Sequence, residues 1–327
     1  MVDHVLVTGG AGYIGSHVCK VLRHHGFIPV AFDNLSTGWR DAVKYGPLVQ
    51  GDLMDRATLD TAFSEFQPVA VMHFAALSLV GESMIDPGRY WRSNVTGSLN
   101  LMEAAVAANC KAFVFSSTCA TYGDPDGIVL DENTPQQPIN AYGGSKLAIE
   151  QMLGNFAASD GLTAVIFRYF NVAGADPEGE VGEQHRPETH LIPLVLDTVA
   201  GRRKTLTVYG SDYNTADGTC VRDYVHVMDL ADAHVLGLRR ALVGQGGVFC
   251  LGTGIGFSVR EVIAQARKAT NHPILVIEGA RRQGDAASLV SGSAYAISEL
   301  GWAPQHSTLP KMIADAWRWS NTPGYAE

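Results

Sequence analysis

The chain has 327 residues, of which 46% are hydrophobic and 17% are charged. These proportions are typical of a folded globular protein and exclude the low-hydrophobicity, high-charge composition of disordered chains. The formal net charge of −9 disfavours nucleic acid and anionic membranes as main partners, because both favour a basic protein surface.

The first half of the chain alternates short β-branched runs with longer amphipathic segments. This pattern is typical of a parallel sheet that is covered by helices on both faces, a doubly wound α/β fold. We predict strands at residues 4–8, 28–32, 69–74, 112–116 and 163–168. Between them we predict helices at residues 14–25, 56–66, 90–108 and 142–158.

The regular alternation ends near Asn171. Residues 173–190 are polar and rich in Gly, Pro and Glu, and long loops such as 210–220 separate the later elements. We interpret residues 1–170 as a cofactor-binding domain and residues 171–327 mainly as a smaller substrate-binding lobe. Residues of about 225–240 are expected to return to the first domain.

The first chemical signal is the segment GGAGYIG at residues 9–15, between a predicted strand and a predicted helix. Glycines at this spacing let the backbone turn tightly and approach a pyrophosphate, which the N–H groups at the helix start attract. The next strand is followed by Asp33, whose carboxylate can bind a ribose and would repel a 2′-phosphate. The glycines alone would fit a plain turn, but together with Asp33 they indicate NAD rather than NADP.

The second signal is Tyr142 followed by Lys146, four residues apart on one face of a predicted helix. An unperturbed tyrosine has a pKa near ~10, which is too high for a base at neutral pH. A neighbouring lysine cation, together with oxidised nicotinamide, is expected to lower the pKa of Tyr142 so that it can take a proton from a sugar hydroxyl. The spacing alone is common on solvent-facing helices.

The third signal is the hydroxyl-rich segment at residues 116–123, which follows a predicted parallel strand. Side chains at the carboxyl end of such a strand point into the ligand crevice, so Thr118 is expected to bind the substrate oxygen and relay its proton. For Ser117 and Thr121, a role in closing the turn is the alternative.

Taken together, these motifs resemble the UDP-glucose 4-epimerase family, a branch of the extended short-chain dehydrogenases/reductases. The resemblance covers the whole chain and implies an α/β Rossmann-type domain with a smaller C-terminal lobe that binds UDP. The matching segments are TGGAGYIGSH at residue 8, FDNLSTG at 32, GDL at 51, HFAAL at 73, VGES at 80, SNVTG at 93, AYGGSK at 141, RYFNVAGA at 168, VRDYVHVMDLA at 221 and ARRQGD at 280.

By this resemblance, residues from both parts of the chain are expected to bind NAD or the UDP-sugar. The expected catalytic residues are Thr118, Tyr142 and Lys146. The expected cofactor-binding residues are Gly9, Gly12, Tyr13, Ile14, Gly15, Asp33, Asn34, Ser36, Gly38, Asp52, Leu53, Phe74, Ala75, Ala76, Asn94, Ser116, Tyr142, Lys146 and Tyr169. The expected substrate-binding residues are Thr118, Tyr142, Asn171, His190, Leu191, Val208, Tyr209, Arg222, Arg282 and Asp285, with the two arginines on the diphosphate.

Three positions depart from the family pattern. His190 stands where an asparagine is usual, and Ser78 replaces a lysine that is often found after the F-A-G/A-L motif. Leu289 stands where some members carry tyrosine and others a small residue associated with N-acetylated sugars. The sequence therefore leaves the preferred sugar open.

The expected reaction is the interconversion of UDP-galactose and UDP-glucose through a 4-keto sugar, with NAD staying bound because each turnover regenerates it. The alternatives are a UDP-N-acetylglucosamine or UDP-pentose 4-epimerase, a nucleotide-sugar dehydratase or decarboxylase, and an NAD-sensing protein without chemistry. A dehydratase needs an acid beside the catalytic threonine, whereas Cys119 and Ala120 follow Thr118 here.

The cysteines and histidines give further expectations. The five cysteines form no C-x-x-C pair, and the eleven histidines form no H-E-x-x-H motif, so we expect reduced thiols and no metal. No signal peptide or membrane span is expected, which favours the cytoplasm. The resemblance implies a homodimer that pairs the helices at 90–108 and 142–158, although their apolar residues would equally fit an intramolecular core.

Overall fold

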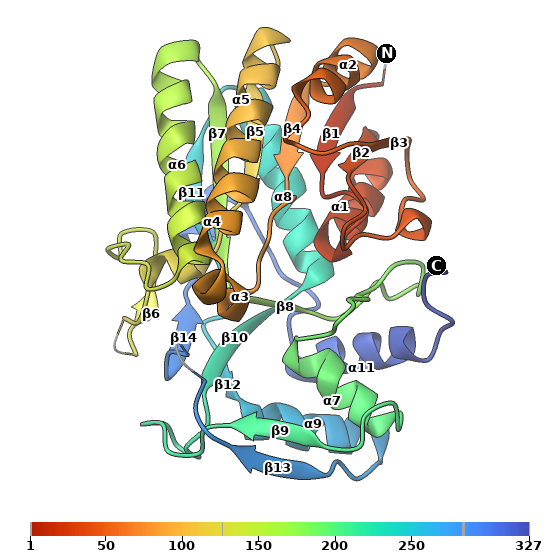
Figure 1. The fold of residues 1–327 in the computed structure, drawn as a ribbon, viewed down its shortest axis with the longest axis vertical. Helices are drawn as coiled ribbons and strands as arrows, with labels where there is room; N and C mark the ends of the chain where they lie inside the picture. Colours follow the sequence, from red (N-terminus) through yellow and green to blue (C-terminus); the bar gives the residue numbers. More distant parts are fainter. Residues whose placement is uncertain (1, 126, 283–284, 327) are drawn as a thin grey trace.

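The computed structural model describes residues 2–125, 127–282 and 285–326, which form an upper and a lower lobe in Figure 1. The upper lobe contains a seven-stranded parallel sheet with the order β11-β7-β5-β4-β1-β2-β3. Its strands are β1 (His4–Thr8), β2 (Ile28–Asp33), β3 (Leu48–Gln50), β4 (Ala70–His73), β5 (Ala112–Ser116), β7 (Thr163–Tyr169) and β11 (Gly247–Leu251). This order confirms the expected Rossmann-type sheet.

Helices cover both faces of this sheet, because successive strand residues point to opposite faces and both sets are apolar. Val5 and Val7 belong to one core cluster with residues of α1 and α8, whereas Leu6 belongs to the other with residues of α2, α5 and α6. These helices are α1 (Tyr13–His24), α2 (Arg56–Phe66), α5 (Gly97–Ala107), α6 (Ala141–Asp160) and α8 (Val227–Leu242).

Polar side chains define where two of these helices begin. Asp55 accepts hydrogen bonds from the N–H groups of Ala57 and Thr58 and so caps α2. Asn140 caps α6 by accepting from Gly143 N at 2.8 Å, and Gly161 ends that helix in the left-handed conformation. Asn140 therefore fixes where Tyr142 enters the first turn of α6.

The structure differs from the sequence expectation around residues 90–108. A single helix was expected there, but the segment consists of α4 (Pro87–Tyr90), a π-helical turn η2 (Trp91–Thr96) and α5. The turn brings Asn94 to face the neighbouring loop and α6. Such turns are frequent at functional sites.

The lower lobe has shorter strands and its own apolar core, with Ile192, Val262 and Met312 from three of its helices at the centre. One sheet has the order β12-β10-β14-β6, with β8 paired to β10, and a separate pair joins β9 to β13. The strands are β6 (Val129–Leu130), β8 (Asn171–Ala173), β9 (Leu206–Tyr209), β10 (Val221–His226), β12 (Gly256–Ser258), β13 (Val276–Gly279) and β14 (Ser288–Ser291). The remaining helices of the chain are η1 (Arg40–Ala42), α3 (Val80–Ile85), η3 (Cys119–Tyr122), α7 (Leu191–Val199), α9 (Val259–Thr270), α10 (Ala294–Leu300) and α11 (Leu309–Ser320).

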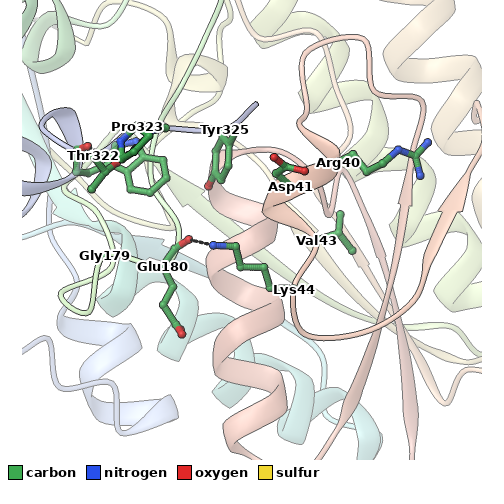
Figure 2. Close-up of a pocket in the computed structure, with 11 residues that line it drawn as sticks. Arg40, Asp41, Val43, Lys44, Gly179, Glu180, Thr322, Pro323 and Tyr325 are labelled. Carbon is green, nitrogen blue, oxygen red and sulfur yellow. Dashed lines mark hydrogen bonds between the residues drawn. The ribbon is translucent and has the colours of Figure 1, made fainter. Parts of the chain in front are cut away.

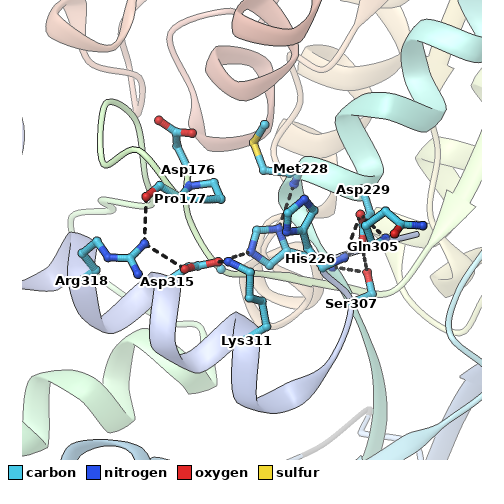
Figure 3. Close-up of polar contacts among 12 residues, drawn as sticks. Asp176, Pro177, His226, Met228, Asp229, Gln305, Ser307, Lys311, Asp315 and Arg318 are labelled. Carbon is cyan, nitrogen blue, oxygen red and sulfur yellow. Dashed lines mark hydrogen bonds and ion pairs between the residues drawn. The ribbon is translucent and has the colours of Figure 1, made fainter. Parts of the chain in front are cut away.

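A buried polar network joins the lobes where β10 leads into α8 (Figure 3). The His226 imidazole lies 3.2 Å from a carboxylate oxygen of Asp315 in α11, and both side chains are fully buried. In the first turn of α8, Asp229 accepts hydrogen bonds from the backbone N–H of His306 and the hydroxyl of Ser307. These contacts fix α11 and the preceding loop against α8.

The chain returns to the upper lobe after β10. Helix α8 contacts α1, β5 and β7, and β11 then pairs with β7 at the edge of the large sheet. The segment that returns to the upper lobe includes β11, which lies beyond the expected residues 225–240. The domain bounds 1–170 and 171–327 remain an interpretation. Among the described residues, no helix combines the length and the apolar character that crossing a bilayer requires.

Candidate active site

The glycine segment forms a tight turn between β1 and α1. Gly9 has a φ of +73°, and a Cβ there would lie 2.7 Å from the backbone nitrogen of Ala75. A Cβ on Gly15 would lie 2.1 Å from the carbonyl oxygen of Gly9, so only glycine fits. Gly12 caps α1 without a side-chain acceptor, which leaves the first N–H groups of that helix free for an anion.

The carboxylate of Asp33 lies beside this turn, at the end of β2. It is 8% exposed and accepts hydrogen bonds from Ala11 N at 3.0 Å and Leu35 N at 2.8 Å. Burial raises the pKa of Asp33, and these backbone bonds oppose the rise. Next to it, Asn34 donates to Asp52 at 2.8 Å, so residues expected to bind the adenosine are adjacent.

Lys146 extends from α6 towards the carboxyl end of β5. It is 3% exposed, and its Nζ donates to the carbonyl of Ser116 at 2.9 Å. Burial disfavours the ammonium form and lowers the pKa of Lys146 to about 7, although Glu150 opposes the shift.

The phenol of Tyr142 interacts with the hydroxyl of Thr118, which brings the two expected catalytic residues together. The expected lowering of the Tyr142 pKa by Lys146 and oxidised nicotinamide stays a prediction for the complex, since the protein groups alone shift this pKa in the opposite direction. Burial dominates and raises it to about 12, while the interaction with Thr118 opposes the rise and Cys119 adds to it. The spacing of tyrosine and lysine could not reveal this desolvation.

Two further residues of the expected site lie next to this group. The hydroxyls of Ser116 and Tyr169 form a hydrogen bond across the parallel pair of β5 and β7. Ser117, for which a turn-closing role was the alternative, instead donates to the buried carboxylate of Glu150 at 2.5 Å. Glu150 also pairs with Arg168 at 2.6 Å, so a buried ion pair that the sequence analysis missed anchors α6 to β7.

Asn94, expected to line the cofactor, is 1% exposed and holds two segments together. Its side-chain amide accepts from Leu77 N at 2.8 Å and donates to Leu77 O at 3.0 Å and to Ser145 Oγ at 3.1 Å. The loop after β4, with Phe74, Ala75 and Ala76, is thereby positioned against α6. A direct contact of Asn94 with a cofactor stays a prediction.

Most of the expected substrate residues of the lower lobe lie on its two small sheets and the loop before β14. Arg282 pairs with Asp285 at 2.9 Å and lies 5.2 Å from the ring centre of Tyr209. On the neighbouring sheet, Arg222 stands beside Leu289 in the parallel ladder of β10 and β14. Asn171 lies in β8, which pairs with the second half of β10.

Val208 is a special case within the expected substrate residues. Its side chain is 1% exposed and belongs to the core of the lower lobe. Contact of Val208 with a ligand stays a prediction.

His190 and Leu191 mark the start of α7, and His190 lies in a cluster that the sequence analysis missed. Its Nδ1 is 2.8 Å from a carboxylate oxygen of Glu183 and 3.1 Å from one of Glu188. Burial opposes the charged imidazole, but the two carboxylates outweigh it and raise the pKa of His190 to about 10. His185 completes the cluster, and the only sequence signal for it is the pattern E-x-H-x-x-E-x-H at residues 183–190.

Two surface pockets lie away from these residues. One of about 540 Å³ is lined by Asp41, Lys44 and Tyr325, and Lys44 donates to the carbonyl of Glu180 across it at 2.6 Å (Figure 2). The other, of about 560 Å³, runs along α6 near Gln151 and Gly154. Neither pocket is lined by the expected catalytic residues, which lie instead at the carboxyl ends of the strands.

Comparison with known proteins decides the family. The family model described as the NAD dependent epimerase/dehydratase family matches residues 5–252. The chain belongs to this family. Membership confirms the expected resemblance, and the family's dependence on NAD agrees with the glycine turn and Asp33.

Individual members of the NAD dependent epimerase/dehydratase family match the chain over nearly its whole length. The UDP-glucose 4-epimerase of Rhizobium leguminosarum bv. trifolii is 51% identical over 318 residues, which are 97% of each chain. The structure of UDP-glucose 4-epimerase from Brucella ovis in complex with NAD has a TM-score of 0.94 at 46% identity, covering 97% of this chain and 98% of that one. The enzyme from Bifidobacterium longum in complex with NAD+ and UDP has a TM-score of 0.91 at 36% identity, covering 97% and 98%.

The residues of the upper lobe fit NAD. The turn leaves no room for a Cβ at Gly9 or Gly15, so the backbone can approach a pyrophosphate closely. Asp33 offers a buried carboxylate for a ribose, and Lys146 is held near the carboxyl end of the central strands. These residues are the ones expected to hold NAD in this chain.

Proposed function

We propose that this chain is a UDP-glucose 4-epimerase that interconverts UDP-galactose and UDP-glucose. The observation that carries the proposal is the convergence of three side chains at the carboxyl end of β5. Thr118 follows this strand, its hydroxyl favours the charged form of the Tyr142 phenol, and Lys146 donates to the carbonyl of Ser116. The 51% identity to the Rhizobium enzyme over 97% of both chains supports the same activity.

The chemistry that NAD supplies when bound is the reversible removal of hydride from sugar C4, which gives a planar 4-keto sugar. Tyr142 takes the O4 proton as hydride leaves, and Thr118 hydrogen-bonds that oxygen and relays the proton. Turning the sugar about its diphosphate offers the other face of the ketone, and Tyr142 then returns the proton to O4 as hydride is returned to C4 with inverted configuration. Arg222 and Arg282 hold the diphosphate during this rotation.

Because Tyr142 is buried, binding of substrate and cofactor must lower its pKa before it can act as a base. Its pKa of about 12 is too high for a base at neutral pH, so a positive charge must approach the phenol when substrate and cofactor bind. Oxidised nicotinamide brings a positive charge when it binds, and Lys146, which donates to the carbonyl of Ser116, is the protein cation proposed to act with it.

A dehydratase reaction is less well supported by the side chains beside Thr118. Elimination needs a carboxylic acid next to the catalytic threonine. Cys119 is fully buried and Ala120 carries no acid, so neither can protonate a leaving hydroxide. The intact group of Thr118, Tyr142 and Lys146 likewise disfavours an NAD-sensing protein without chemistry.

The sugar preference rests on the surroundings of Leu289. Its place beside Arg222 puts a medium-sized apolar side chain near the arginine that is expected to bind the diphosphate. We favour unmodified hexoses, and UDP-N-acetylglucosamine and UDP-pentoses are the alternative substrates to compare.

For assembly and location we propose a homodimer in the cytoplasm. Met84, Ile85 and Trp91 are exposed by 47%, 86% and 43% on the segments that contact α6, which supports a dimer interface on this side. The five cysteines are free and buried, as suits a reducing compartment.

The test is incubation of the purified chain with UDP-galactose, without added NAD, and chromatography of the products. We expect UDP-glucose to form, and a Tyr142→Phe variant to lose about 10²- to 10⁴-fold in kcat, the usual contribution of acid–base catalysis. Tyr295→Phe, at a 45% exposed tyrosine, is the matched control and should keep full activity. If none of the named UDP-sugars is converted even with added NAD, the proposal fails.

A further inference from the structure

Four side chains of one short segment converge beside the cofactor turn. Glu183, His185, Glu188 and His190 each direct one ligand atom inward, and these atoms all lie within 4.8 Å of one another. The carboxylates are 7% and 12% exposed, and the histidines 27% and 40%. Two imidazole nitrogens and two carboxylate oxygens are a ligand set that zinc binds in proteins.

The spacing of these atoms fits one tetrahedral ion. Ligand atoms about 2.0 Å from Zn²⁺ stand about 3.3 Å apart along each edge of a tetrahedron. The Nδ1 of His190 is 2.8 Å and 3.1 Å from the oxygens of Glu183 and Glu188, and the Nδ1 of His185 is 3.2 Å and 3.6 Å from oxygens of the same two residues. These distances, of which the two to Glu188 end on different carboxylate oxygens, lie near the tetrahedral edge.

One of the four atoms lies close to the carboxylates but makes no hydrogen bond to them. The Nδ1 of His185 is buried and makes no hydrogen bond among the described residues, although it faces the two carboxylates. A buried polar atom without a hydrogen bond is rare because it loses its solvation without compensation. An ion at the centre of the cluster would bond to this nitrogen.

The segment is held in place by contacts outside the cluster. Trp39 donates from its indole to the carbonyl of Gln184 at 2.7 Å, and Trp319 donates to the carbonyl of Glu183 at 2.9 Å. The ring of Tyr13, from the cofactor turn, meets His185 edge-on with 6.5 Å between ring centres. The ligands are therefore preorganised, and they link the start of α7 to the glycine turn.

We propose that Glu183, His185, Glu188 and His190 form a structural site for a first-row transition-metal dication, with Zn²⁺ as the ion. Metal ligation requires both imidazoles to release their protons, and the two carboxylates then carry a charge of −2, which a dication neutralises. All four positions are taken by protein atoms, which is typical of structural rather than catalytic zinc. No metal was expected from the sequence because this spacing differs from the helical H-E-x-x-H motif.

The test uses the full chain with any affinity tag removed, stripped of metal by dialysis against a chelator and then supplied with ZnCl₂. Metal content is measured by plasma mass spectrometry, and affinity by competition with a zinc dye. We expect one zinc per chain, and CoCl₂ in its place to give the visible absorption of four-coordinate cobalt. A chain that binds no zinc overturns the proposal.

Variants assign the ligands. The double change His185→Ala/His190→Ala should weaken zinc binding more than about 100-fold, since loss of even an indirect partner of a metal ligand costs 10- to 100-fold. The matched control His24→Ala/His25→Ala removes two exposed histidines at the C-terminal end of α1 and should bind zinc normally. Glu188→Gln keeps the side-chain volume and should also lose affinity while retaining the wild-type circular dichroism spectrum. Unchanged zinc affinity in these cluster variants would overturn the proposal.

Discussion

Lys146 and Lys20 are both buried lysines, but their surroundings differ. Lys20, on α1, is 2% exposed and contacts Asp176 at 2.7 Å, Glu178 at 2.5 Å and Glu180 at 2.8 Å. Lys146 is 3% exposed and donates to a neutral carbonyl.

The pKa values of the two lysines move in opposite directions. Burial lowers that of Lys146 to about 7. For Lys20, burial acts the same way, but hydrogen bonds to the three carboxylates outweigh it and raise the pKa. Lys20 therefore holds loop 176–180 to α1. Lys146 has a strongly lowered pKa, which is typical of a lysine in a functional site.

The largest effect on stability is expected from Lys20→Met. This change leaves Asp176, which is 1% exposed, without its ammonium partner, and breaking a buried pair in this way costs about 3–5 kcal/mol. Urea denaturation measures the free energy of unfolding, and Lys204→Met, at an exposed lysine, is the control. A loss below about 1 kcal/mol would mean that Lys20 acts like a surface lysine.

The second prediction concerns Lys146→Met and its dependence on pH. The folded pKa of about 7 lies below the ordinary value near ~10.4, so between these pH values the unfolded wild-type chain binds more protons and wild-type stability rises with pH. The variant lacks this penalty, so it should be the more stable protein at pH 7. Its advantage should shrink by on the order of 2 kcal/mol by pH 9.

Denaturation of both proteins at the two pH values checks this prediction, and the groups they share cancel in the difference. The same variant should lose epimerase activity, because the group near Tyr142 loses its cation. A stability difference that is constant or grows with pH would show that burial does not disfavour the charged form of Lys146.

The smallest effect is expected at a pair that is exposed. Arg260 and Glu278 lie 2.7 Å apart, but their side chains are 45% and 49% exposed. Arg260→Ala should change the free energy of unfolding by less than about 1 kcal/mol, because water and salt screen such pairs. A large loss of stability in Arg260→Ala would show that pairing with a carboxylate, rather than burial, explains the effect expected for Lys20→Met.

The same contrast explains what the sequence could predict. Strands such as β1 and β5 were predicted with their observed bounds, because burial on both faces gives an uninterrupted apolar run. Strand β3 has three residues, none of them buried, and lacks such a signal. The π-helical turn in 90–108 was missed because the apolar pattern continues through it.

For the site, motif spacing identified Tyr142, Lys146 and Thr118 but not the environment of their atoms. The pKa of Tyr142 depends on burial, which residues distant in the sequence determine. The cluster at 183–190 lies on an irregular segment, where no helical or strand periodicity relates spacing to position. Its geometry depends on contacts from Trp39 and Trp319.

The return of α8 and β11 to the large sheet has a consequence for dissecting the protein. A fragment that ends at residue 170 would leave β7 as an uncovered edge strand and would expose Phe167, which is fully buried in the complete chain. Such a fragment is expected to aggregate rather than bind nucleotide by itself. Exchange of substrate lobes between relatives would therefore need junctions on both sides of residues 227–251, because a single cut cannot separate the two halves.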